Sequence, residues 1–284
     1  MTTVIVLAGL NGGTGKTTIC HYLGGALAND GLKVLLVDND ASHGLTSLLA
    51  AADEHEYRSS GNKESVRLKD EVIRSRYANL FRIRACSELN ELARIPIRER
   101  QAWGNVEMYF YDRFREFEII LIDCASGNGR RARGCILMAD LVLIPTRAEP
   151  SGVRGVRRTI RWINWTLAAA RGTMIESRVV VNLRPARSLD TTYHESLLRE
   201  DFGKDVLPMT IPTLEALKRP ARADKEGRMV RSNSRHKDPM GVMSSLLPVY
   251  MKHSSSFALP TPLPAPRIDE STTGESAFET YPLA

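Results

Sequence analysis

The stretch Leu10-Asn11-Gly12-Gly13-Thr14-Gly15-Lys16-Thr17-Thr18 lies between an apolar run at residues 3–8 and a helix-forming run at residues 22–28. This is the pattern of a strand, a glycine-rich turn and a helix. Glycines let the chain turn tightly, so that successive backbone N–H groups point at one anion, and the helix that follows adds the positive end of its dipole. The stretch therefore predicts a phosphate loop formed by residues 11–18.

Two side chains at the end of this loop have predicted roles at a bound nucleotide. Lys16 is expected to neutralise the β and γ phosphates of ATP, and the Thr17 hydroxyl is expected to bind Mg²⁺. The usual motif begins with glycine where this chain has Leu10. A glycine-rich turn that binds nothing is the alternative interpretation, but Gly15-Lys16-Thr17 at the start of a helix favours a nucleotide site.

Further apolar runs predict strands at residues 33–38, 80–85, 118–123, 141–146 and 178–183, separated by helical or polar sequence. This alternation predicts an α/β fold of the P-loop NTPase kind, with a mostly parallel central sheet and helices on both faces. The segment 51–79 is rich in charged residues, and we expect an exposed helix there with a break at residues 59–62.

Acidic residues follow two of the predicted strands. One strand ends in Asp38-Asn39-Asp40, and the strand Ile119-Ile120-Leu121-Ile122 ends in Asp123. Because parallel strands end at the same edge of a sheet, these carboxylates are expected beside the phosphate loop. Asp123 is expected to hold magnesium, usually through water. A helix cap is the alternative interpretation of Asp123.

Taken together, these segments resemble the ParA/MinD family of deviant Walker ATPases. The resemblance rests on residues 12–18, 34–40, 119–124 and 139–145, together with Glu149-Pro150, Gly155 and Ile211-Pro212, in the order in which the family has them. It covers roughly residues 1 to 220. It implies ATP hydrolysis by a homodimer that forms with ATP and buries two nucleotides at its interface.

The resemblance also implies roles for individual residues. Asp40 would orient the attacking water, which makes it a catalytic residue with Lys16, and Asp38 would support the magnesium shell. Asn182 and the backbone around Pro212 would contact adenine. The alternative for Asn182 is an asparagine that forms the turn after its strand.

Asn11 departs from the family, which usually has a lysine at this position that reaches the phosphates of the partner subunit. Asparagine donates a hydrogen bond but carries no charge, so slow hydrolysis is expected. Some carboxysome-positioning relatives of ParA also lack this lysine. We hypothesise that an arginine substitutes for it, with Arg130 and Arg131 favoured over Arg147. The alternative is that all three are ordinary surface arginines.

Basic residues are concentrated in two segments of a chain whose net charge is +6. In the predicted helix 151–171, one face carries Val153, Val156, Ile160, Ile163 and Leu167, and another carries Arg154, Arg157, Arg158 and Arg161. A second basic cluster runs from Lys218 to Lys237. Both suit contacts with the phosphates of nonspecific DNA, and solvated helix faces are the alternative.

Composition and the remaining motifs bound the domain organisation. Residues 1–253 are expected to form one ATPase domain, and the Pro, Ser and Thr-rich residues 254–284 a disordered tail. The cysteines show neither metal-ligand spacing nor a disulfide framework, and no apolar run is long enough to span a membrane. We therefore expect a cytoplasmic protein, associated with the nucleoid and without a membrane partner.

The predicted function is that of a partition or positioning ATPase. It would bind nonspecific DNA as an ATP-bound dimer and be released by a ParB-like or other adaptor protein that carries a plasmid, a chromosome or a large protein cargo. Two alternatives remain open at this point: a nucleotide-dependent binding switch with negligible hydrolysis, and a metabolic or maturation ATPase of the same superfamily.

Overall fold

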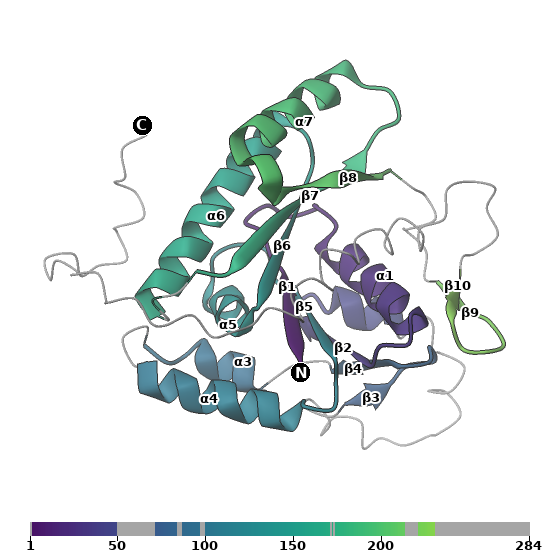
Figure 1. Cartoon of the computed structure of the whole chain (residues 1–284), viewed down its shortest axis with the longest axis vertical. Helices are drawn as coiled ribbons and strands as arrows, with labels where there is room; N and C mark the ends of the chain where they lie inside the picture. Colours follow the sequence, from purple (N-terminus) through teal and green to yellow (C-terminus); the bar gives the residue numbers. More distant parts are fainter. Residues whose placement is uncertain are drawn as a thin grey trace, which may run out of the picture.

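A computed structural model of the chain describes residues 2–49, 72–83, 87–96, 100–170, 172, 174–213 and 221–230 (Figure 1). Its centre is an eight-stranded sheet in the order β3-β4-β2-β5-β1-β6-β7-β8. The strands are β1 (Thr3–Leu7), β2 (Val34–Asn39), β3 (Ile73–Arg74), β4 (Leu80–Ile83), β5 (Ile119–Cys124), β6 (Leu141–Thr146), β7 (Glu176–Arg184) and β8 (Val206–Pro212). Neighbouring strands of the described sheet run parallel, except for β3 against β4.

Helices cover both faces of this sheet. They are α1 (Lys16–Asn29), α3 (Ser87–Leu92), α4 (Arg100–Arg113), α5 (Arg130–Met138), α6 (Pro150–Ala170) and α7 (Leu189–Phe202), and α7 continues into the 3₁₀ turn η2 (Gly203–Asp205). In β1, Val4 and Val6 pack in one apolar layer with residues of α3 to α7. Ile5 and Leu7 pack in the opposite layer with residues of α1. Because both faces are buried, the inner strands have continuous apolar sequences.

The architecture confirms the fold class expected from the sequence. The predicted strands correspond to β1, β2, β4, β5, β6 and β7, and the predicted helix 151–171 corresponds to α6. The exposed helix expected over residues 51–79 is wrong for the described part, residues 72–79. There β3 pairs with β4 because the chain returns along the sheet edge. Residues 51–71 lie outside the described part, as does the predicted tail 254–284.

A small hairpin, β9 (Arg222–Ala223) and β10 (Met229–Val230), packs on α1. The side chain of Asn29 exchanges two hydrogen bonds of 2.9 Å with the backbone of Met229. Gly25 leaves room for the Met229 side chain, since a Cβ atom at Gly25 would lie 2.2 Å from the Met229 sulfur. The hairpin therefore covers the helix that follows the glycine-rich loop.

His21 is a fully buried residue of α1. Its ring lies edge-on to those of Tyr22 and Tyr77, at centroid distances of 5.0 and 6.1 Å. Neither ring nitrogen has a hydrogen bond among the described residues. Burial lowers the pKa of His21 from 6.5 to about 4, so the folded protein holds this imidazole neutral.

This buried imidazole predicts a loss of stability in mild acid. Between pH 6.5 and about 4 the unfolded chain binds a proton at His21 and the folded chain does not. The free energy of unfolding should therefore fall over this range, by about 3 kcal/mol in total. Replacing His21 with Leu should remove this component in urea denaturation measured from pH 7.5 to 4.5. His194→Gln serves as the control, and an unchanged pH slope in His21→Leu would contradict the prediction.

Candidate functional site

The glycine-rich loop connects the end of β1 to the start of α1 and needs glycine at two positions. Gly13 has a φ of 69° and Gly15 a φ of 90°, both in the left-handed region. At Gly15 there is also no room for a side chain, because a Cβ atom would lie 2.2 Å from the amide nitrogen of Asn182. The local sequence thus forces the tight turn that precedes α1.

Asn182 holds this loop from the neighbouring part of the sheet. Its side chain is 3% exposed, and its amide nitrogen donates to the Thr14 carbonyl over 2.7 Å. The structure thus joins Asn182 to the loop, and its predicted contact with adenine stays a prediction. Pro212, the other residue predicted there, lies at the same sheet edge, where it pairs in register with Arg184.

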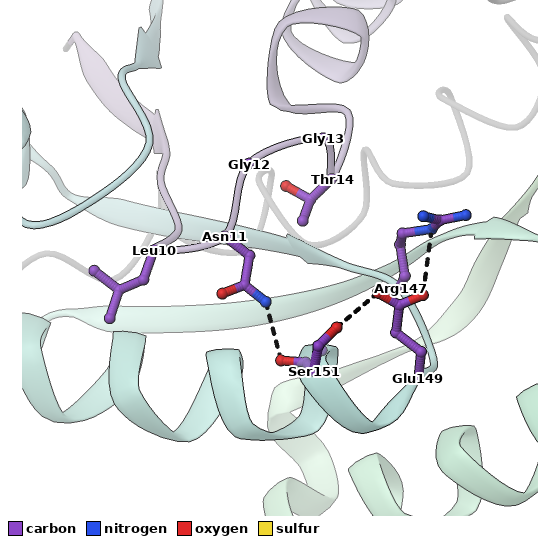
Figure 2. Close-up of a pocket in the computed structure, with 9 residues that line it drawn as sticks. Leu10, Asn11, Gly12, Gly13, Thr14, Arg147, Glu149 and Ser151 are labelled. Atoms are coloured by element: carbon purple, nitrogen blue, oxygen red, sulfur yellow. Dashed lines mark hydrogen bonds and ion pairs between the residues drawn. The ribbon is translucent and has the colours of Figure 1, made fainter.

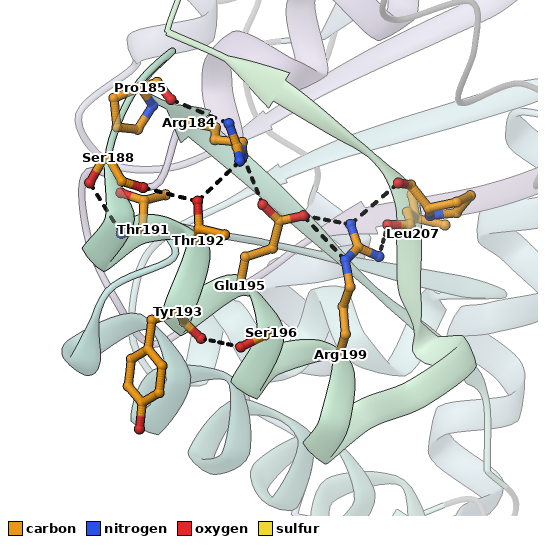
Figure 3. Close-up of polar contacts among 11 residues, drawn as sticks. Arg184, Pro185, Ser188, Thr191, Thr192, Tyr193, Glu195, Ser196, Arg199 and Leu207 are labelled. Atoms are coloured by element: carbon orange, nitrogen blue, oxygen red, sulfur yellow. Dashed lines mark hydrogen bonds and ion pairs between the residues drawn. The ribbon is translucent and has the colours of Figure 1, made fainter.

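An ion-pair network supports this outer part of the sheet (Figure 3). Arg184 and Arg199 each donate to a different carboxylate oxygen of Glu195, over 2.8 Å. Arg199 also donates to the carbonyls of Leu207 and Pro208, over 3.2 and 3.3 Å. Partial burial acts to raise the pKa of Glu195, but the two guanidinium groups bring it below its ordinary value. The network fixes α7 to the end of β7 and to the start of β8.

Lys16 projects its ammonium group back toward the loop. It donates to the Ser126 hydroxyl over 2.7 Å and to the Asn11 carbonyl over 3.3 Å. Its side chain is 6% exposed, and this burial lowers the pKa of the ammonium, while the charges of Asp123 and Asp40 act in the opposite direction. The geometry thus places a cation at the start of α1, within the field of two of the predicted acidic residues.

The predicted carboxylates do converge at this edge of the sheet. Asp38 on β2 and Asp123 on β5 are direct register partners. Asp38 accepts hydrogen bonds from the backbone nitrogen and the hydroxyl of Thr46, over 2.7 and 2.5 Å. Asp40 accepts from the backbone nitrogen of Ser42 over 2.9 Å. Asp38 and Asp40 are thus held by short local contacts of the chain that follows β2.

Asp123 differs because its carboxylate is 1% exposed and neither oxygen has a hydrogen bond of standard geometry among the described residues. Burial raises its pKa to about 7, while the nearby Thr17 hydroxyl acts to lower it and the Asp38 charge adds to the rise. A buried carboxylate with so few donors is costly, and a hydrated cation would supply both charge and further donors.

The residues at this edge fit a magnesium ion that keeps most of its water. The described residues contain no group of three or more His, Cys, Asp or Glu side chains able to hold a metal. Mg²⁺ commonly binds through one or two carboxylates together with phosphate oxygens and water. Thr17, Asp38 and Asp123 match that chemistry, with Asp123 the residue that gains most from a cation.

On the other side of the loop, a cavity of about 470 Å³ is lined by residues of the loop and of the start of α6 (Figure 2). It is lined by Leu10, Asn11, Gly12, Gly13, Thr14, Arg147, Glu149, Ser151 and Gly152. The Asn11 amide nitrogen donates to the Ser151 carbonyl over 3.0 Å. Of the three arginines considered as substitutes for the missing lysine, Arg147 lies in this lining, whereas Arg130 and Arg131 are exposed at the start of α5. Arg147 is thus the candidate that lies beside Asn11, and the choice among the three arginines stays a prediction.

Several polar residues of the site were missed by sequence reasoning. Ser126, Thr46, Ser151 and Thr159 each make a hydrogen bond to a loop residue, to Lys16 or to Asp38. None belongs to a motif, and each reaches the site through the fold.

The basic face of α6 is exposed as expected. Arg154, Arg157, Arg158 and Arg161 all point to solvent. Arg157 forms an ion pair of 2.6 Å with Asp201, and within the described residues the other three have no ion pair. In the second basic cluster only residues 221–230 are described, and there Arg228 pairs with Asp224 and Glu226. Among the described helices, none is long and apolar enough to cross a membrane.

Comparison with known proteins identifies relatives along most of the chain. The family model of an AAA domain, AAA_31, matches residues 2–172. An uncharacterized protein of Mycobacterium tuberculosis is 28% identical over 156 residues, which are 54% of this chain and 49% of that protein. The chain thus spans about half the length of this curated relative. The chromosome-partitioning ATPase Soj of Thermus thermophilus is 26% identical over 212 residues, 73% of this chain and 80% of Soj.

Solved structures share the fold at lower identity. Cobyrinic acid a,c-diamide synthase from Mycobacterium smegmatis, with a bound ATP analogue and magnesium, has a TM-score of 0.65 and 18% identity, and the match covers 94% of this chain and 100% of that one. An ATP complex of a Cyanothece McdA variant has a TM-score of 0.60 and 24% identity, covering 76% of this chain and 85% of that one.

Proposed function

We propose that this chain, which belongs to the ParA/MinD family of P-loop ATPases, binds and hydrolyses ATP and positions a large cargo through nucleotide-dependent binding to nonspecific DNA. In this proposal it dimerises with ATP and is released by a ParB-like or other adaptor protein. The observation that supports it most is the convergence of Lys16, Asp38, Asp40 and Asp123 on the glycine-rich loop.

The loop residues divide the work of binding and hydrolysis. Residues 11–18 would surround the phosphates with backbone N–H groups, and Lys16 would exchange its bonds to Ser126 and the Asn11 carbonyl for phosphate oxygens. When bound, Mg²⁺ would neutralise charge on the phosphates beside Thr17, Asp38 and Asp123. Asp40, which follows β2 at the same edge, would orient the attacking water.

The relationship to a chromosome-partitioning ATPase favours a positioning role over a metabolic one. The similarity to the cobyrinic acid enzyme is below 25% identity and supports only a shared fold. The choice of DNA as the surface rests on the arginine stripe of α6, which we define as Arg154, Arg158 and Arg161. Three exposed guanidinium groups along one helix face suit contacts with successive phosphates and read no base sequence.

Removing the arginine stripe should weaken ATP-dependent retention on DNA and reduce its dependence on salt. Replacing all three residues with Ala should lower the slope of log K against log salt by roughly 3, because each lost phosphate contact contributes about 0.9. Retention on a nonspecific duplex is measured with Mg-ATP, with Mg-ADP and without nucleotide. Each series runs from about 50 to about 300 mM salt.

The matched control removes the same charge elsewhere on the surface. Arg94, Arg115 and Lys204 are exposed cations outside both basic segments, and their triple Ala variant should retain most of the binding. Equal losses of DNA retention in the two triple variants would show that the effect comes from net charge and not from the arginine stripe. Absence of retention in the unmodified protein would refute the positioning function on DNA.

Arg147 is the side chain that we propose supplies the missing cation to the partner subunit's nucleotide. Its Nε lies 3.8 Å from Glu149, an exposed and therefore weak pairing that can be exchanged for phosphate. Arg147→Ala should slow ATP turnover by at least about tenfold, a lower bound because a trans-acting arginine can contribute about 10³ to 10⁵ in rate. Arg130→Ala and Arg131→Ala should change it little, as measured by phosphate release at saturating ATP.

Mixing two inactive variants separates action in trans from action within one subunit. In a mixed dimer of Lys16→Ala and Arg147→Ala, one site has both an intact Lys16 and the partner's intact arginine. Turnover should therefore recover in the mixture if Arg147 acts across the interface. Unchanged turnover in all three single arginine variants would remove the hypothesis, whereas DNA retention without any turnover in the unmodified protein would favour the nucleotide-dependent switch.

A further inference from the structure

The first half of α6 lies unusually close to the start of the glycine-rich loop. A Cβ atom at Gly155 would lie 2.4 to 2.8 Å from three side-chain atoms of Asn11. A Cβ atom at Gly152 would lie 1.9 Å from the Arg147 carbonyl oxygen. Glycine at position 155 is therefore what lets the helix and the loop touch, while Gly152 lets α6 start close to the end of β6.

Two hydrogen bonds cross this contact. The Leu10 backbone nitrogen donates to the Thr159 hydroxyl over 3.1 Å, and that hydroxyl donates to the Gly155 carbonyl over 2.8 Å. The Asn11 amide nitrogen donates to the Ser151 carbonyl over 3.0 Å, as Figure 2 shows. Thr159 is 1% exposed, so water does not compete for the first bond. Both attachments lie in the segment that leads directly into the phosphate loop.

The same helix carries the arginine stripe on its outer side. Thr159 faces inward between Arg158 and Arg161, which face solvent. Val156 and Ile163, on the inner face, are 1% and 0% exposed and pack in the layer beneath the sheet. A helix held along its inner face moves as a rigid body, so a displacement at Thr159 reaches the arginines of the next turns.

We propose that Thr159 is a positioning residue that joins residues 10–11 to α6 so that the two move together as one mechanical unit. A nucleotide bound in the loop would then determine how well ordered α6 and its arginine stripe are. Asn11 forms the second attachment of this unit. The residue that stands where the family has its trans-acting lysine thus serves within its own subunit. The part of this inference that concerns DNA binding rests on the proposed function. The part that concerns the coupling between the loop and α6 does not.

Hydrogen exchange of the full chain with and without Mg-ATP tests the coupling between the loop and α6 directly. In the unmodified protein, Mg-ATP should slow amide exchange in residues 151–163 at least about fivefold, the lower range of coupling between linked sites. Thr159→Val keeps the shape but leaves the Leu10 N–H without a partner, so the slowing in α6 should be lost while exchange in the loop still slows. Thr159→Ser keeps the hydroxyl and should restore the effect in α6.

Thr166→Val is the matched control. Thr166 lies on the same helix and is fully buried, but its hydroxyl has no hydrogen bond among the described residues. This variant should behave like the unmodified protein. Protection of α6 that persists in Thr159→Val, or that is lost equally in Thr166→Val, would overturn the inference. If Thr159→Val does not fold, Asn11→Ala cuts the second attachment at a more exposed position and should show partial loss.

DNA retention distinguishes a failure of this inference from a failure of the proposed function. If Thr159 couples the nucleotide in the loop to the arginine stripe, Thr159→Val should bind DNA equally with and without Mg-ATP. Thr159→Ser and Thr166→Val should keep the nucleotide dependence of DNA binding. Nucleotide-dependent retention that survives in Thr159→Val overturns the inference and leaves the proposed function intact. Protection of α6 without any DNA retention in the unmodified protein supports the mechanical unit and refutes DNA as its target.

Discussion

A buried ammonium group opposite buried carboxylates is the constraint on which the rest of the site depends. Lys16 and Asp123 are each almost inaccessible to solvent, and each alters the pKa of the other through its charge. The ammonium has polar partners at the loop, whereas the Asp123 carboxylate has no standard hydrogen bond among the described residues. A site of this kind is completed by a ligand with anionic oxygens and a hydrated cation. The magnesium complex of ATP is such a ligand.

The parallel sheet places this constraint at one edge. β2, β5 and β1 are adjacent, so their carboxyl ends deliver Asp38, Asp123 and the glycine-rich loop to the same place. The neighbouring strand ends give the loop its outer support, through Asn182 on β7 and the ion pairs that fix α7. On the other side, α6 touches the loop through Thr159 and Ser151. The loop is thus held by β7 on one side and by α6 on the other, and α6 also presents arginines to solvent.

Sequence patterns could predict the parts of the structure that local chemistry dictates. Continuous apolar runs identify the inner strands, and the glycines before Lys16 identify the loop, because positive φ at Gly13 and Gly15 is a local requirement. The edge strand β8 was not predicted, since Pro208 and Pro212 interrupt its pattern as edge positions permit. Contacts such as Leu10 with Thr159 join distant segments through tertiary packing, and nothing in either segment indicates them. The place of Arg147 in the cavity beside Asn11 likewise depends on the fold.

Calorimetric titration of the protein with Mg-ATP tests most directly whether this edge binds a nucleoside triphosphate. The unmodified chain should bind, and Lys16→Ala should bind roughly 10- to 100-fold more weakly, because it loses charge-assisted hydrogen bonds to phosphate. Lys33→Ala removes a lysine that pairs with Glu116 at the start of β2, away from the loop, and should bind normally. A folded protein that gives no heat of binding with Mg-ATP, or equal affinities for Lys16→Ala and the unmodified chain, would contradict the nucleotide site.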